Sequence, residues 1–222
     1  MRKRWGISRT APLGILLALT GYWGAWVDHK TAALVLSGLD MGEYAKFLPE
    51  VREGSLVVLR ELFYLPPLAA ALCLALLVGW LWSRYSLMAR VLMLGLAVGL
   101  CLVVLPPYPF VLHALSSAEF RGQFILSVLC LLGVAAAPLY HRLSDRVAQL
   151  LLTMLACLGP LPAIAQFCAI RPALERAYGW PLPIGWGLWV MVVGFAFVIA
   201  ATIRDEVRRA THFRSASHVA PK

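Results

Sequence analysis

Six apolar stretches, separated by shorter polar segments, account for most of this chain. Each is about as long as a helix that crosses a bilayer, because about 20 residues span a hydrocarbon core of about 30 Å. None carries Asp, Glu or Lys in its middle, and Arg occurs only near an end. The stretches are 11–27, 62–82, 87–105, 123–140, 147–168 and 185–203. The pattern predicts an all-α integral membrane protein, a single domain over 1–222 built as a bundle of about six transmembrane helices.

The composition agrees with this prediction and leaves no room for a separate soluble domain. Hydrophobic residues form 61% of the chain and charged residues 14%, against about 45–50% and about 25% in soluble proteins. Most of the 20 Lys and Arg lie on the side predicted to hold both chain ends, including the basic tail 204–222, and most of the 11 acids lie on the other side. The positive-inside rule therefore places both termini in the cytoplasm, in a plasma or inner membrane.

Tryptophan and proline refine the predicted helices. Indole rings favour the headgroup level, so three Trp pairs are predicted at membrane interfaces. Proline removes a backbone donor, so Pro66-Pro67 predicts a kink in the second helix and Pro160 with Pro162 a break or bend in the fifth. The alternative for both is ordinary punctuation at a helix end. The Trp pairs are Trp23 with Trp26, Trp80 with Trp82, and Trp186 with Trp189.

The first extracytoplasmic loop, 28–60, is the most polar stretch between the apolar segments. Asp40-x-x-Glu43 is typical of a helix N-terminus, so we expect a short amphipathic helix over 40–53 that forms a cap on the outer mouth of the bundle. Its apolar stripe is expected to contain Tyr44, Phe47, Leu48 and Val51.

This cap carries the candidate partner-binding residues. It is interpreted either as a solvated cover for helix ends or as a lid or docking surface for another subunit. The charged side chains that would bind a partner protein are Asp40, Glu43, Lys46, Glu50 and Arg52.

Gly95 and Gly99 form a GxxxG pattern in the third apolar stretch. Two glycines one turn apart let a second helix approach closely. They are predicted at a helix–helix contact, either inside the bundle or between copies of the chain.

The sequence shows no catalytic or metal-binding motif that would define an enzyme. It lacks Gly-x-Ser-x-Gly, His-Glu-x-x-His and a Gly-rich phosphate loop with Lys. Its five Cys lie singly in apolar segments, which is typical of small buried side chains. Cys101 and Cys168 both fall in outward halves, and the sequence does not decide whether they approach each other. No cofactor, metal or nucleic-acid partner is predicted, and the basic residues flank membrane ends without a nucleic-acid-reading motif.

Two function classes fit this pattern. The first is a non-catalytic membrane protein that is a subunit or accessory component of a membrane complex, such as a transporter assembly. The second is a small-molecule binding or translocation component that holds an apolar or amphipathic ligand under the outer cap. The second would use the polar residues of the predicted helices, chiefly Tyr64, Gln123 and Gln166.

Overall fold

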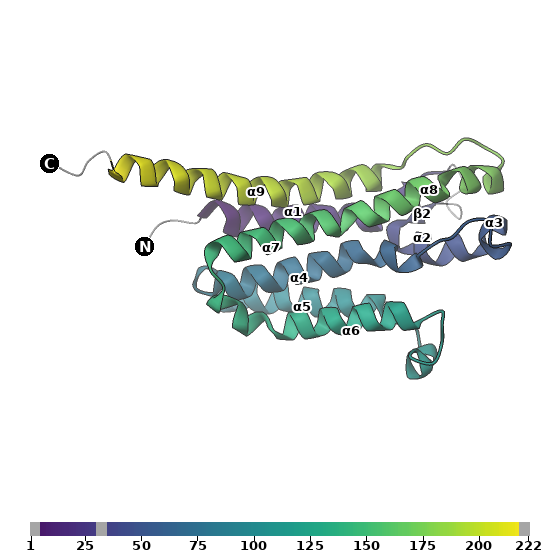
Figure 1. The fold of residues 1–222 in the computed structure, drawn as a ribbon, viewed down its shortest axis with the longest axis horizontal. Helices are drawn as coiled ribbons and strands as arrows, with labels where there is room; N and C mark the ends of the chain where they lie inside the picture. Colours follow the sequence, from purple (N-terminus) through teal and green to yellow (C-terminus); the bar gives the residue numbers. More distant parts are fainter. Residues whose placement is uncertain (1–4, 30–34, 218–222) are drawn as a thin grey trace.

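The computed structural model describes residues 5–29 and 35–217 and is built from helices that run side by side (Figure 1). The start of α1 and the end of α9 lie at one end of the bundle, and the short helices of the outer cap lie at the other. The long helices are α1 Trp5–Trp23, α4 Leu65–Trp80, α5 Leu87–Val104, α6 Arg121–Ala135, α7 Asp145–Leu158, α8 Pro160–Tyr178 and α9 Trp186–Ser217. The basic tail thus continues α9 as far as Ser217, and residues 218–222 lie outside the described part.

The all-α prediction is confirmed, and four helical segments are long and apolar enough to cross a membrane. Two further apolar helices, Thr10–Trp23 and Arg121–Ala135, are shorter. The count of six spans, and which end faces the cytoplasm, stay predictions. The four long segments are Arg60–Trp80, Leu87–Val104, Asp145–Tyr178 and Trp186–Val207.

Helix α4 is the centre of the bundle. It packs against α1, α5, α6 and α7. Its sequence is almost entirely Leu, Ala and Val between Leu68 and Val78, and those residues are buried on nearly every side. A helix that is hydrophobic all round is expected in such a position.

Helices α1 and α9 are the most closely packed pair, and glycines make that contact possible. A Cβ added at Gly21 would lie 2.5 Å from the carbonyl oxygen of Gly187, and one added at Gly14 would lie 2.8 Å from that of Gly194. Real Cβ atoms do not approach backbone so closely, so only glycine lets these two helices meet. Small residues that allow two helix backbones to approach closely are also typical of helix contacts in membranes.

The GxxxG pattern of α5 does not make such a contact inside the chain. A Cβ added at Gly95 or Gly99 would meet no heavy atom of the described residues within 4 Å. The prediction that these glycines pack within the bundle is therefore wrong, because they lie on the face of α5 that points away from α4. Self-association through them stays a prediction.

Pro66 and Pro67 lie at the start of a helix, where the sequence predicts a kink within one. A 3₁₀ segment, η3 Arg60–Tyr64, precedes α4, and Pro66 and Pro67 occupy the first turn of α4. The first-turn amides have no intrahelical acceptor, so proline costs little there.

The break predicted near Pro160 is confirmed at Gly159, which separates α7 from α8. The Gly159 amide still donates to the Leu155 carbonyl at 2.9 Å, so the two helices form one nearly continuous column. This column runs through Pro172 to Tyr178, ten residues beyond the predicted end at 168.

The outer cap is divided into α2 Gly38–Tyr44, η2 Ala45–Phe47 and α3 Pro49–Arg52, where a single helix was predicted. Pro49 disfavours helix in the preceding residue, and Leu48 is extended with ψ 133°. The N-cap is Ser37, three residues earlier than predicted: Asp40 donates its amide to the Ser37 hydroxyl, and its carboxylate accepts the Ser37 amide. The prediction that Asp40 is the N-cap is thus wrong.

The apolar face of the cap also differs from the predicted stripe. Met41, Ala45 and Leu48 are buried, whereas Phe47 is 64% exposed. The cap is joined to the bundle by a short antiparallel ladder of β1 Ala25–Val27 and β2 Leu36–Ser37.

Two of the predicted interface tryptophans lie inside the protein. Trp26 is fully buried and packs edge-on against Phe63 and Phe167 beneath the cap. Trp80 is also buried, and its indole donates to the Asp145 carboxylate at 3.0 Å. Both indole rings are thus covered by other residues of the chain.

Candidate functional site

Six polar side chains meet where the outer cap lies on the bundle, and we call them the outer polar cluster. Arg60 is at its centre and is only 12% exposed. Its guanidinium donates to Glu43 Oε1 at 2.6 Å and to Glu119 Oε1 at 2.8 Å. The cluster consists of Glu43 from α2, Lys46 from η2, Arg60 and Tyr64 from η3, Glu119 from the loop before α6, and Gln123 from α6.

The remaining contacts join these segments to one another. Lys46 donates to both carboxylates, at 2.8 Å to Glu43 and 3.2 Å to Glu119. The Tyr64 hydroxyl donates to Glu43 at 2.8 Å. Gln123 accepts from Arg60 at 3.3 Å and donates to the carbonyl of Val104 at 2.7 Å, which extends the network to the end of α5. The cluster therefore fastens the cap to α5 and α6.

Proton affinities in the cluster follow from these contacts. Burial alone would raise the pKa of Glu43, but hydrogen bonds from Lys46 and Tyr64 and the charge of Arg60 outweigh it, so this pKa lies below its ordinary value. The hydrogen bond to Glu43 raises the pKa of Lys46. Both groups are thus held in their charged forms by the folded cluster.

The lowered pKa of Glu43 predicts a loss of stability in acid. A group whose pKa is lower in the folded state stabilises the fold above the ordinary Glu pKa of about 4.3, and this contribution is lost as pH falls through the lowered value. We expect Glu43→Gln to melt below the parent at neutral pH, with the two melting temperatures converging in acid. Thermal melts in detergent across this pH range test it, with exposed Glu53→Gln as the control. A difference in melting temperature between Glu43→Gln and the parent that stayed the same at every pH would contradict the prediction.

The structure separates the residues predicted to bind a partner. Glu43 and Lys46 are engaged in the cluster, the Asp40 carboxylate accepts the amide of Ser37, the N-cap of α2, and Glu50 pairs with Arg176 of α8 at 2.8 Å. Arg52 is exposed and forms no ion pair with any described residue.

Of the residues predicted to bind a ligand, the structure brings two together. Tyr64 and Gln123 both contact Arg60. Gln166 is buried in α8 and takes part in none of the cluster's hydrogen bonds. Sequence reasoning did not select Arg60 or Glu119, although Glu119 is the only acid in the segment 106–122 and could have been found on that ground.

The cysteines give no metal site. Cys101 lies beside Cys130, with 3.1 Å between the two sulfurs, whereas Cys168 is exposed on α8. Within the described residues, no group of three or more His, Cys, Asp or Glu side chains is placed to hold a metal ion.

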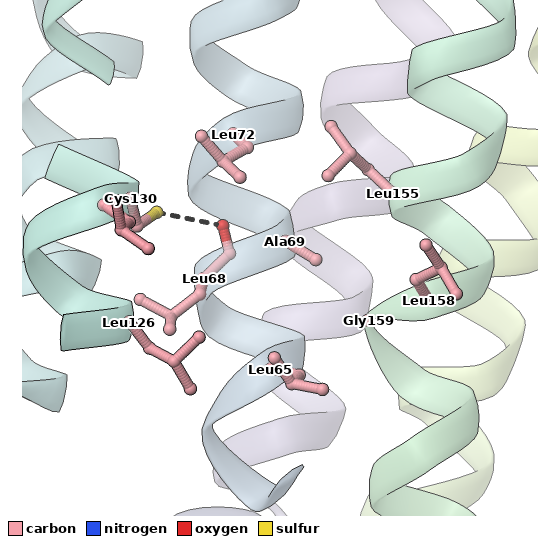
Figure 2. Close-up of a pocket in the computed structure, with 10 residues that line it drawn as sticks. Leu65, Leu68, Ala69, Leu72, Leu126, Cys130, Leu155, Leu158 and Gly159 are labelled. Atoms are coloured by element: carbon pink, nitrogen blue, oxygen red, sulfur yellow. Dashed lines mark hydrogen bonds between the residues drawn. The ribbon is translucent and has the colours of Figure 1, made fainter. Parts of the chain in front are cut away.

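An apolar groove of about 210 Å³ lies between α6 and α7, with α4 as its floor (Figure 2). Leu65, Leu68 and Ala69 of α4 lie along the floor. The α6 wall includes Leu126 and Leu129, and the α7 wall includes Leu155 and Leu158.

The chemistry of the outer polar cluster is structural. Its two cations face its two carboxylates, and the side chains donate to one another at ordinary hydrogen-bond distances. A balanced, mutually paired set of charges can hold segments together, but it presents no activated nucleophile or base. Comparison of the chain with protein-family models, with curated proteins and with solved structures finds no match in any of the three.

Proposed function

We propose that this chain is a non-catalytic multi-pass membrane protein that acts as a subunit of a membrane assembly, such as a transporter, in a plasma or inner membrane with both termini in the cytoplasm. Its partner is another membrane protein or a second copy of the chain. The observation that carries the proposal is the open face of α5, which no other described part of the chain covers.

The exposure of α5 contrasts with the burial of α4. Only 22% of the α5 span is buried inside the protein, against 83% of the span that contains α4. The uncovered face has Gly95 and Gly99 at its middle, with open space above both glycines. Large apolar side chains flank them: Val91, Leu92, Leu96, Leu102 and Val103. Small residues between large apolar ones suit a partner helix that packs closely within lipid.

The outer polar cluster gives a second reason to place the docking surface on α5. Glu43 and Lys46 are already engaged within the chain, so a partner that bound them would have to displace Arg60 and Glu119. The open α5 face requires no such displacement. We therefore assign docking to α5 and regard the charges of the cap as holding the cap in place.

Gly99→Leu is expected to release the partner without unfolding the protein. A leucine there has room in the isolated chain but would occupy the space of a partner helix. Purification in mild detergent followed by native mass spectrometry measures the stoichiometric partner or the dimer. Val193→Phe, at an exposed position of α9, is the control and should retain the partner. A parent chain that is monomeric and alone in native membranes, or a complex that survives Gly99→Leu, would contradict the proposal.

The small-molecule alternative depends on the apolar groove instead of the polar residues predicted for it. Tyr64 and Gln123 are engaged with Arg60, and Gln166 does not join them. A ligand under the cap would therefore meet a closed polar network. The groove is lined by apolar side chains and lies apart from that network.

A further inference from the structure

Two cysteines from neighbouring helices meet inside the bundle. The Sγ atoms of Cys101 in α5 and Cys130 in α6 lie 3.1 Å apart, and both side chains are buried. The Cys130 thiol also donates to the carbonyl oxygen of Leu68 in α4, at 3.4 Å (Figure 2). The pair of thiols therefore lies where α4, α5 and α6 pack together.

The packing of α5 against α6 holds the two sulfur atoms within bonding reach of each other. A disulfide bond is about 2 Å long, so the sulfurs at 3.1 Å would have to approach by only about 1 Å to form one. A second contact fixes how the two helices lie, because the Gln123 amide of α6 donates to the Val104 carbonyl of α5 at 2.7 Å. Small side-chain rotations, without a rearrangement of the helices, would therefore bring the sulfurs together.

The surroundings of the pair favour an apolar oxidant. Cys130 is among the residues that line the apolar groove, and the other lining residues are leucine, alanine and glycine. The groove is open at Leu129 and Leu158, which are 59% and 56% exposed. A charged oxidant such as glutathione disulfide would lose its hydration on entering such a groove, which costs free energy. An uncharged, apolar oxidant such as a quinone avoids that cost.

We propose that Cys101 and Cys130 are a site of disulfide formation, and that a quinone is the oxidant. The S–S bond forms as the two thiols together lose two protons and two electrons, and the quinone takes up both and becomes a quinol. The bond would join α5 to α6 covalently, in addition to the packing of both helices against α4. This site is separate from the uncovered face of α5, and its failure in a test leaves the subunit proposal unchanged.

The test counts free thiols in the full chain after exposure to two oxidants. The protein is purified in detergent, reduced with a phosphine, freed of the reductant and incubated with duroquinone or with glutathione disulfide. Duroquinone is a fully methylated quinone, so it oxidises thiols without remaining attached to them. The protein is then denatured, its free thiols are alkylated, and mass spectrometry of the intact chain and of its peptides counts and locates the alkylated cysteines. Cys101→Ala removes one member of the pair, Cys168→Ala on the exposed surface of α8 is the matched control, and Cys130→Ala replaces Cys101→Ala if that variant does not purify.

We expect duroquinone to lower the number of alkylated cysteines in the parent from five to three, with Cys101 and Cys130 recovered as one linked peptide pair. Cys168→Ala should likewise lose two alkylated cysteines, whereas Cys101→Ala should lose none. Glutathione disulfide should leave Cys101 and Cys130 free for alkylation. Five alkylated cysteines in the parent after duroquinone, or a linked pair that includes another cysteine, would overturn the disulfide site. Equal formation of the linked pair with glutathione disulfide would overturn the assignment of the oxidant.

Discussion

Gly21→Leu is expected to destabilise the protein by about 3 kcal/mol, at the upper end of the range for overpacking a tight interior. Gly21 lies where α1 crosses the backbone of α9, and an added Cβ would already be 2.5 Å from the Gly187 carbonyl oxygen and 2.7 Å from the Cα of Met191. These neighbours are backbone atoms and cannot rotate away. The two helices would have to separate, and their contact is the most extensive in the fold.

Thermal melting in detergent and the yield of folded protein measure this effect. Gly194→Leu should behave similarly, because its Cβ would meet the side chain of Ala18 at 2.7 Å. Gly99→Leu is the matched control: the same change, also within a long apolar helix, but with no neighbour within 4 Å. Its free energy of unfolding should lie within about 0.5 kcal/mol of the parent's, as is usual for surface substitutions. If Gly21→Leu and Gly99→Leu melted alike, the close approach of α1 and α9 would be wrong.

Arg60→Met is expected to cost about 2 kcal/mol, because it leaves two carboxylates without their principal partner. Arg60 is nearly buried, whereas Glu43 and Glu119 are about half exposed, at 47% and 48%. Water can therefore hydrate the two carboxylates when Arg60 is removed. The loss of stability is smaller for this reason than for a fully buried ion pair. Methionine keeps most of the apolar length of the side chain, so packing changes little.

The matched control for Arg60→Met is Arg52→Met, since Arg52 is exposed and forms no ion pair with the described residues. Melting temperature and limited proteolysis of the cap both report the effect, because the cluster joins the cap to α5 and α6. Arg60→Lys should be intermediate, since a single ammonium cannot reproduce the planar fork that reaches two carboxylates. An Arg60→Met protein that melted and resisted protease like Arg52→Met would show that the cap is held by its apolar contacts alone.

Together these predictions assign different tasks to different surfaces of the bundle. The α1 and α9 contact and the outer polar cluster maintain the fold, whereas the described residues leave one face of α5 uncovered. The same substitution, Gly99→Leu, should leave stability unchanged and abolish assembly. That combination distinguishes a docking face from an internal contact.

The sequence by itself determined the helices, because each residue of an apolar stretch must satisfy its backbone hydrogen bonds locally. Apolar stretches of bilayer length became helices, and the Gly159-Pro160 step ended α7 where proline chemistry predicts. The polar loop after α1 contains the cap, although Pro49 divides it more sharply than its periodicity indicated.

The tertiary structure alone decided which faces meet. A GxxxG pattern shows that a helix can be approached closely but does not name the partner, so Gly14 and Gly21 pack tightly while Gly95 and Gly99 face outward. Arg60 meets Glu119 across 59 residues of sequence, because tertiary packing brings η3 beside the loop before α6. Local pattern specifies that a stretch is helical, whereas the neighbours of each helix depend on how all the helices pack against α4 at once.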